Sequence, residues 1–277
     1  MTDVRVGTCG YGYYDPPEGW KETYPSKLAA FAAAFEHLEL NRTFYELPMV
    51  STVERWREEA DEGHEAADAE GEFTFSLKAW QAMTHPISSP TWRDHDEDLT
   101  ETEREGVGYL RPNETVRSAW RETRERALAL EAEVVVLQTP PSFDASETHE
   151  ENVRDLLEGI DREGLSIAWE PRGDWPDHPC RVASICEDLE LIHVTDLMRR
   201  EPLDGGDVGY TRLHGLNENH YDYDYDYDDA ELRELADRLV DLAGDRERTF
   251  SLFNNFEMDA NARRLAEILA KEGSESS

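Results

Sequence analysis

The sequence predicts a (β/α)8 barrel, in which eight parallel strands alternate with helices around a closed sheet. Runs rich in β-branched and aromatic residues alternate with helical stretches along most of the chain, and such alternation implies parallel pairing. Polar residues stand at the ends of these runs, where the strands of such a barrel form one active face. The length of 277 residues fits one barrel, which takes roughly 250 residues.

The elements follow from hydrophobic periodicity and from residues that start or stop them. The predicted strands are 4–9, 37–43, 72–78, 133–138, 165–170, 191–195, 208–214 and 249–253. A first helix is expected near Pro25 or Ser26, because proline is well tolerated in the first helical turn. A second is expected from Ser51, where Glu54 completes a capping-box pattern. Further helices are predicted at 113–130, 149–162, 180–188, 228–243 and 259–271.

One barrel domain is expected to span residues 1–272. Residues 85–112 form a long polar excursion bounded by prolines, which predicts a loop insertion. Such a connection is typical of an active-site lid or of a disordered loop, and both interpretations stay open. Residues 273–277 are polar and predict a disordered tail.

The charge of the chain is strongly negative. Its formal net charge is −35, with 63 acidic against 28 basic residues. A disordered acidic protein is disfavoured by the 38% hydrophobic content and seven Trp. We therefore expect a folded, halophilic protein with an acidic surface, since molar salt screens repulsion beyond about 3 Å. The same charge disfavours nucleic-acid and anionic membrane partners unless a local basic pocket overrides it.

Three cysteines, Cys9, Cys180 and Cys186, are too few for a disulfide framework and contain no CxxC pair. The chain enters its first strand directly, so a signal peptide is not expected. No run approaches the ~18 apolar residues of a membrane span. We expect a cytoplasmic protein; the pattern does not indicate an oligomeric state.

An alternating Tyr-Asp repeat occupies residues 221–228. Strict alternation is compatible with a strand that has one aromatic and one acidic face. Repeated carboxylates could bind a cation, but the glycine turn and final glutamate of a calcium loop are missing. The interpretation we favour is an acidic loop before a helix.

Polar residues at the strand ends are the candidate site. Residues two apart on a strand share a face, which groups Asn41 with Thr43 and Tyr45, and Arg212 with His214. The predicted catalytic residues are Glu170, His214 and Lys78. A carboxylate and an imidazole at one site can serve as base and acid, so Glu170 and His214 are expected to exchange protons, while Lys78 is expected to help hold the anion. The predicted substrate-binding residues are Tyr11, Asn41, Thr43, Tyr45, His85, Gln138, Arg172, Trp175, Arg212, Asn254 and Asn255.

The sign of the predicted site favours an anion. Lys78, Arg172 and Arg212 stand at strand ends of a chain with few basic residues. Guanidinium groups bind phosphate and carboxylate bidentately, which predicts a small anionic ligand. The alternative is that these bases only neutralise Glu39, Glu170 and Asp196, as salt bridges that close the barrel.

No cofactor is predicted, although a divalent metal stays open. His85, Glu170, Asp196 and His214 are the alternative metal ligands, because imidazole and carboxylate suit zinc, manganese or iron. No HxH or HExxH motif supports them, and neighbouring basic residues would repel a cation. Cys9 is a candidate nucleophile without an identifiable base, and a buried cysteine is usually inert.

The strand-end motifs stand at 7–11, 39–45 with Pro48, 75–78 with Thr84 and His85, 137–143, 169–172 with Trp175, 212–215 and 253–255. Taken in order over about residues 4–269, these motifs resemble the YecE-like family of TIM-barrel domains of unknown function. The composition indicates a haloarchaeal-type member. Departures from the family pattern are Cys9 for serine, Thr139 for leucine and Pro171 for phenylalanine.

The resemblance implies the barrel fold but no established reaction. Three functions therefore stay open. The first is an enzyme that acts on a small phosphorylated or carboxylated substrate by acid/base chemistry. The second is a metal-dependent phosphodiesterase or endonuclease-like hydrolase, by distant analogy of fold with sugar isomerases and metal-dependent endonucleases. The third is a non-catalytic binding protein that uses the same pocket.

Overall fold

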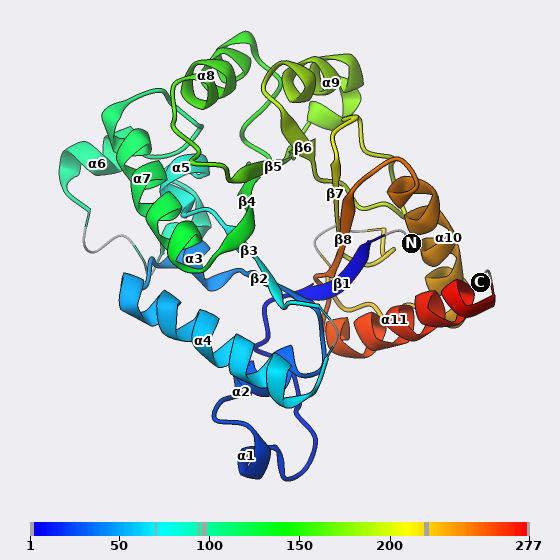
Figure 1. The fold of residues 1–277 in the computed structure, drawn as a ribbon. Coiled ribbons are helices and arrows are strands. Elements are labelled where there is room, and N and C mark those ends of the chain that lie inside the picture. The colour runs from blue at the N-terminus through cyan, green and yellow to red at the C-terminus, as the bar shows by residue number, and fades with distance from the viewer. Residues whose placement is uncertain (1–2, 70, 94, 96–98, 219–221, 276–277) are drawn as a thin grey trace.

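The computed structural model describes residues 3–69, 71–93, 95, 99–218 and 222–275. Eight parallel strands follow one another around the sheet in the order β6-β5-β4-β3-β2-β1-β8-β7. The sheet nearly closes between its two edge strands, where Thr195 forms a single bridge with Thr211 (Figure 1). The strands are β1 Val4–Cys9, β2 His37–Leu40, β3 Thr74–Lys78, β4 Ala132–Gln138, β5 Ser166–Glu170, β6 Leu191–His193, β7 Val208–Leu213 and β8 Arg248–Phe253.

Helices surround the sheet, as expected for a (β/α)8 barrel (Figure 1). The helices are α1 Trp20–Thr23, α2 Lys27–Ala32, α3 Arg42–Tyr45, α4 Val50–Ala66, α5 Gln81–Thr84, α6 Glu101–Gly106, α7 Glu114–Ala129, α8 Glu147–Glu158, α9 Pro179–Asp188, α10 Asp229–Ala243 and α11 Met258–Glu275. Short 3-10 turns occupy Pro90–Trp92 and Trp175–Asp177. Helix α11 takes in residues 273–275, where the tail was expected; residues 276 and 277 lie outside the described part.

The second strand is shorter than predicted. It ends at Leu40, and Asn41 already has helical dihedral angles (φ −85°, ψ −22°) as the residue before α3. The Thr43 hydroxyl hydrogen-bonds the carbonyls of Leu40 (2.9 Å) and Lys78 (2.8 Å), which ties this turn to the end of β3. The prediction that Asn41, Thr43 and Tyr45 share one strand face is therefore wrong.

The predicted helices begin within two residues of their expected positions. Ser26 caps α2 by accepting from the backbone N–H of Ala29 at 3.1 Å. Helix α4 begins after Met49, whose side chain makes no capping bond, so the capping box predicted from Ser51 and Glu54 is wrong. The one-residue earlier start places Ser51 inside the first turn, where its side chain cannot act as the cap.

The excursion at 85–112 contains regular structure. Helix α6 begins with a capping box formed by Thr100 and Glu103. The chain then returns to α5, where the N–H of Gly108 donates to Ala82 (2.8 Å) and that of Tyr109 to Thr84 (3.0 Å). The excursion is thus anchored at its far end by backbone hydrogen bonds, and a lid role stays a prediction.

Side chains of the strands alternate between two cores. One set packs between the sheet and the helices and includes Phe75 and Leu77 of β3. The other fills the lumen. The apolar lumen residues are Cys9, Val134, Val136, Ala168, Ile192, Val194, Tyr210, Phe250 and Leu252. The lumen is therefore a packed interior, and a ligand has room only where the strands end.

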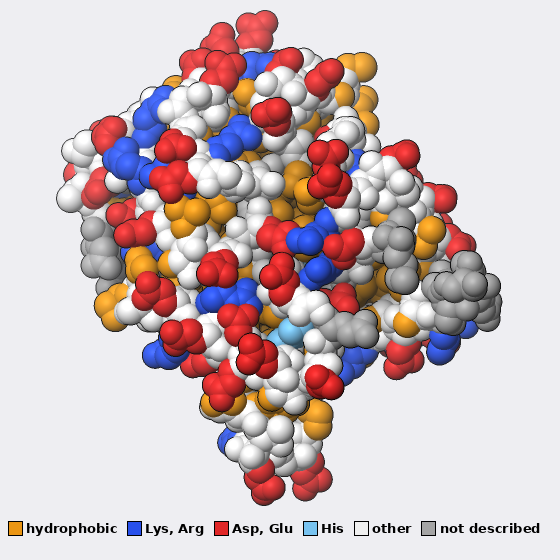
Figure 2. Space-filling model, viewed as in Figure 1, with side chains coloured by type: hydrophobic (Ala, Val, Ile, Leu, Met, Phe, Trp, Pro, Cys, Tyr) orange, Lys and Arg blue, Asp and Glu red, His pale blue; other side chains and the backbone are white. Residues whose placement is uncertain are grey.

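The described surface is rich in carboxylates, which Figure 2 shows scattered across one face, with fewer basic side chains among them. No helix in the described residues is both long and apolar enough to cross a membrane.

Candidate functional site

A chain of buried polar side chains crosses the lower lumen. His37 Nε2 lies 3.0 Å from Ser76 Oγ, which lies 2.6 Å from the Tyr210 hydroxyl. Tyr210 donates to Oε2 of Glu39 at 2.8 Å. Desolvation by burial lowers the pKa of His37 well below its ordinary value, so the imidazole is neutral. This series of hydrogen bonds links the interior of the barrel to the ionised residues at the strand ends.

Arg212 is the centre of the upper network. Its Nη2 donates to Oε1 of Glu39 at 2.9 Å, its Nη1 donates to Glu170, and its Nε lies 3.4 Å from Cys9 Sγ. Only 1% of Arg212 is exposed, and 0% of Glu39. Arg212 thus joins carboxylates of β2 and β5 across the barrel, and a ligand has little access to its guanidinium.

Cys9 is unsuited to nucleophilic attack. Burial, with the nearby Glu39 carboxylate, raises the pKa of the thiol far above its ordinary value. A thiol that stays protonated is a weak nucleophile, and Cys9 packs with the apolar lumen.

Glu170 is held ionised. Burial by itself would raise the pKa of this carboxyl, but Arg172 and Arg212 outweigh that effect and hold the pKa well below its ordinary value. The Nε of Arg172 lies 2.9 Å from Glu170 Oε1, and its Nη2 lies 2.8 Å from the same oxygen. A carboxylate paired in this way is a weak base and serves better as a counter-ion.

Glu39, Lys78, Glu170, Arg172 and Arg212 form a cluster of charged residues at the strand ends. Among the described residues, Lys78 is the cation of this cluster that lacks a carboxylate contact. It ends β3, is 9% exposed, and places Nζ 3.8 Å from the centroid of the Phe44 ring. Burial lowers the pKa of Lys78 to about 7, with further contributions from the positive charges of Arg212 and Arg172. Such an amine exchanges protons readily near neutral pH.

Two neutral imidazoles flank the cluster. Burial lowers the pKa of His85 to about 3, and that of His214 to about 3. His85 lies 2.8 Å from the Thr84 hydroxyl through Nδ1. His214 has a buried Nε2 with no hydrogen-bonding partner in the described structure. An unpartnered buried nitrogen is costly to maintain, so a ligand group that pairs with it would gain binding energy.

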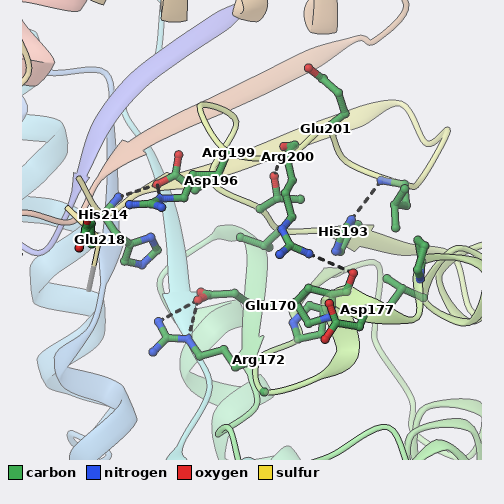
Figure 3. A pocket seen from close by; sticks show the side chains of 18 residues that line it. Glu170, Arg172, Asp177, His193, Asp196, Arg199, Arg200, Glu201, His214 and Glu218 are labelled. Atoms are coloured by element: carbon green, nitrogen blue, oxygen red, sulfur yellow. Dashed lines mark hydrogen bonds and ion pairs between the residues drawn. The ribbon is translucent and has the colours of Figure 1, made fainter. Parts of the chain in front are cut away.

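A cavity of about 600 Å³ opens beside this cluster, over the ends of β5, β6 and β7 (Figure 3). This volume suits a small molecule. Asp196 accepts backbone N–H groups from His214 and Met198, both at 3.1 Å, and burial raises its pKa to about 6. The lining residues that bear charge or imidazole are Glu170, Arg172, Asp177, His193, Asp196, Arg199, Arg200, Glu201, His214 and Glu218.

The predicted site residues fall into three groups. Glu170, Arg172 and His214 line the cavity. Lys78, His85 and Arg212 do not line it. They still interact electrostatically with residues that do, since Arg172 contributes to the lowered pKa of Lys78 and of His85, and Arg212 contributes to the lowered pKa of Glu170. The remaining predicted residues lie outside the cavity lining, and these are Tyr11, Asn41, Thr43, Tyr45, Gln138, Trp175, Asn254 and Asn255.

Several of that last group have structural contacts. The fully buried indole of Trp175 donates to the carbonyl of Phe143 at 2.8 Å. Asn255 donates to the carbonyl of Tyr225 at 2.6 Å and so holds the Tyr-Asp segment. Tyr45 is 43% exposed and lines a separate shallow hollow.

The others lie nearer the mouth or the first helices. The Asn41 amide donates to the Cys9 carbonyl at 3.0 Å, leaving its own oxygen buried without a partner. Gln138 ends β4 opposite Glu170 in the strand register. The N–H of Asn254 donates to Leu213, and the ring of Tyr11 packs near Phe31.

The Tyr-Asp segment lies against the strand ends without pairing as a strand. Over residues 222–228 the aspartates are exposed, while Tyr223 and Tyr225 are half-buried and Tyr227 is buried. The hydroxyl of Tyr227 accepts the N–H of Gly215 at 2.9 Å. The ring of Tyr223 lies 5.8 Å from that of His214. The alternation therefore places the aromatic side toward the barrel; residue 221 lies outside the described part.

Two residues of the network received no site role from the sequence. Glu39 is predicted only as a counter-ion, and Tyr210 is not among the predicted site residues. Both interrupt apolar strands, and Tyr210 lies two residues before Arg212 on the same face. That alternation is the signal that identifies them.

Of the four alternative metal ligands, Glu170, Asp196 and His214 line the cavity and His85 does not. Within the described ranges, no group of three or more His, Cys, Asp or Glu side chains is arranged to hold a metal ion. Glu170 faces two guanidinium groups, and both oxygens of Asp196 accept backbone N–H groups.

Comparison with known proteins identifies a family. The model described as "Protein of unknown function DUF72" matches residues 5–276. Comparison with curated proteins gives no match. A DUF72 family protein from Enterococcus faecalis V583 has a similar structure, with a TM-score of 0.68 and 15% identity over 98% of each chain.

Two further solved structures share the fold. A DUF72 family protein from Thermotoga maritima MSB8 has a TM-score of 0.68 and 21% identity, over 97% of this chain and 99% of that one. A D-psicose 3-epimerase from Clostridium cellulolyticum H10 has a TM-score of 0.54 and 10% identity, over 96% and 98%. At these identities the likeness concerns the fold alone.

Proposed function

This chain belongs to the DUF72 family, and on that premise we propose that it is an enzyme that acts on a small phosphorylated or carboxylated substrate by acid/base chemistry. The observation that carries the proposal is the composition of the cluster at the strand ends. Three cations, Lys78, Arg172 and Arg212, face two carboxylates, Glu39 and Glu170. When Lys78 is protonated, this cluster has an excess positive charge inside a strongly acidic protein.

Arg172 is the group best placed to contact an anion. Its side chain is 18% exposed and lines the cavity, whereas Arg212 is buried behind Glu170. The outer wall carries both signs, with Asp177, Glu201 and Glu218 among its carboxylates. The anionic group of the substrate is therefore assigned to the inner end of the cavity, beside Arg172.

Proton transfer is assigned to Lys78 in preference to Glu170. A catalytic acid or base works best when its pKa lies near the working pH. The pKa of Lys78, about 7, meets this condition, whereas two arginines hold Glu170 ionised. His214, neutral and unpartnered at Nε2, supplies a second polar contact to the substrate.

Calorimetric titration with phosphate, sugar phosphates and citrate tests the proposal. We expect binding to the wild type that weakens roughly ten- to hundred-fold in Arg172→Gln, the range of a charge-assisted contact. The matched control is Arg42→Gln, because Arg42 has a side chain 74% exposed and lies outside the cavity lining. If no anion binds at millimolar concentration, or if divalent metals bind tightly at Glu170 and His214, the metal-dependent hydrolase becomes the better hypothesis.

The acidic composition supports a second part of the proposal, that the protein works in concentrated salt in the cytoplasm of a halophilic organism. With a net charge of −35, the folded chain repels itself unless counter-ions screen its surface. The dependence of the melting temperature on salt concentration tests this part of the proposal.

A further inference from the structure

We propose that Lys78 forms a covalent imine with its substrate, which would then be a small anionic aldehyde or ketone. This inference rests on the proposed function and deepens it, because it names the substrate class and the reacting atom. It starts from the position of Lys78, the last residue of β3, on the lumen side at the strand ends.

Within the described residues, the amine of Lys78 is not engaged by a hydrogen bond, although the residue is largely buried and lies outside the cavity lining. Neighbouring Thr74 and Ser76 of β3 contact His37 in the lumen, so Lys78, two residues further on, projects from the same face. Its Nζ has no hydrogen-bonding partner within the described chain and is not among the fully buried unpaired polar atoms. The Phe44 ring packs on it at 3.8 Å, while 9% of the residue stays exposed.

The surroundings favour the uncharged amine. A lysine becomes a nucleophile when it is desolvated or lies beside another cation, since both effects disfavour its protonated form. Lys78 has both, namely burial and the charges of Arg212 and Arg172, and its pKa falls to about 7. An ordinary lysine would be almost entirely protonated at that pH.

The step balances without an oxidant or reductant. The Nζ lone pair attacks the carbonyl carbon, and the C=O π pair moves to oxygen, which takes up one amine proton to give a carbinolamine. The nitrogen lone pair then expels that oxygen, which leaves as water with the second amine proton. The net change is amine plus carbonyl to imine plus water. Arg172, whose positive charge contributes to the lowered pKa of Lys78, would hold the carboxylate or phosphate of the same molecule.

The use of lysine in this chain gives an independent argument. Of 28 basic residues only four are lysines, namely Lys21, Lys27, Lys78 and Lys271. Lys21 and Lys271 are exposed, and Lys27 donates to the carbonyl of Gly12 at 2.8 Å. Elsewhere in the cluster the basic residue is arginine. An arginine at 78 would supply charge equally well but cannot form an imine, because it stays protonated.

The experiment is reductive trapping followed by peptide mass spectrometry. The full chain in concentrated salt is incubated with pyruvate, glycolaldehyde phosphate or neutral glycolaldehyde, and sodium borohydride then reduces any imine to a stable secondary amine. We expect the two anionic probes to label Lys78 at least ten-fold more than Lys21 or Lys27. The labelling of Lys78 should reach a plateau as the probe concentration increases. Labelling should increase as the pH rises through about 7. Neutral glycolaldehyde should label the lysines less selectively.

The variants separate this inference from the proposed function. Lys78→Arg should abolish labelling at position 78 while sulfate binding persists, and Lys27→Arg, the matched control, should leave Lys78 labelling unchanged. If the wild type binds anions but no probe labels Lys78 above Lys21 and Lys27, the imine is excluded and the acid/base proposal stands. If Lys78 is labelled selectively although free anions do not bind, the imine is supported and the anion-binding proposal fails.

Discussion

The guanidinium of Arg212 hydrogen-bonds the carboxylate of Glu39 across the barrel lumen, at 2.9 Å, with both side chains buried. The two residues lie 173 positions apart in the chain. The same arginine reaches Glu170, so one side chain joins strands β2, β5 and β7. The three basic strand ends are therefore not equivalent, because Arg212 is buried between two carboxylates while Arg172 lines the cavity.

Removing the Glu39 charge should strongly destabilise the fold. In Glu39→Gln, Arg212 keeps only one carboxylate partner, and breaking a buried ion pair typically costs about 3–5 kcal/mol. Chemical denaturation monitored by circular dichroism measures the change. The control is Glu46→Gln, since Glu46 pairs with Arg42 at 3.8 Å on the surface and should cost under about 1 kcal/mol. Equal effects of the two variants would show that the lumen pair is not a major source of stability.

The titration of Lys78 should make stability depend on pH. Its folded pKa of about 7 lies below the ordinary value of 10.5, so between these values the unfolded chain binds more protons. Stability should therefore rise with pH across that window relative to Lys78→Met, which has no group to titrate there. Parallel denaturation curves at pH 6.5, 8 and 9.5, roughly spanning the window, measure the difference. A constant difference between the two proteins would mean that Lys78 keeps an ordinary pKa.

Anion binding should weaken as Lys78 loses its proton. Sulfate is the suitable probe because its own charge does not change near neutral pH. We expect its affinity for the wild type to fall as the pH rises above about 7, since the excess positive charge of the cluster disappears. In Lys78→Arg the affinity should stay level over the same range, because arginine remains protonated. Calorimetry at each pH tests this, and a parallel fall in both proteins would exclude Lys78 as its cause.

The hydroxyl of Tyr227 should contribute to stability through one bond. It accepts the N–H of Gly215. Gly215 has a φ of +94°, and a Cβ at this position would lie 2.5 Å from Tyr225 Cβ, so glycine allows the segment to pack this closely. Tyr227→Phe leaves that N–H unpaired and should cost about 1–3 kcal/mol. Tyr13→Phe, at a residue 69% exposed, should cost almost nothing by the same denaturation assay. A neutral result for both would show that water replaces the lost acceptor.

Salt should stabilise the fold. Repulsion among surface carboxylates extends over roughly 20–30 Å at about 0.01–0.02 M salt but only about 3 Å at 1 M. We expect the melting temperature to rise over a potassium chloride series that covers this range, with loss of structure at the low end. Circular dichroism measures both quantities. An unchanged melting temperature would contradict the proposed adaptation to concentrated salt.

Local pattern by itself determined the fold class and showed which polar residues stand at the strand ends. Strand and helix periods repeat within ten or so residues, so the barrel and the strand-end position of Glu170, Arg172 and His214 could be predicted from neighbouring residues alone. One departure from the predicted elements has a cause that is not local. Strand β2 ends at Leu40 because the Thr43 hydroxyl bonds the carbonyl of Lys78, a contact between distant segments that no short-range pattern contains.

Only the tertiary structure decided which charges are buried together and which border the cavity. The sequence presents Lys78, Arg172 and Arg212 as equivalent bases at strand ends. Closure of the barrel buries Arg212 between Glu39 and Glu170, leaves Arg172 on the cavity wall, and places Lys78 beside Phe44 without a carboxylate contact in the described chain. Burial and the distances between charges determine pKa values and access, and both arise only when strands far apart in sequence come together.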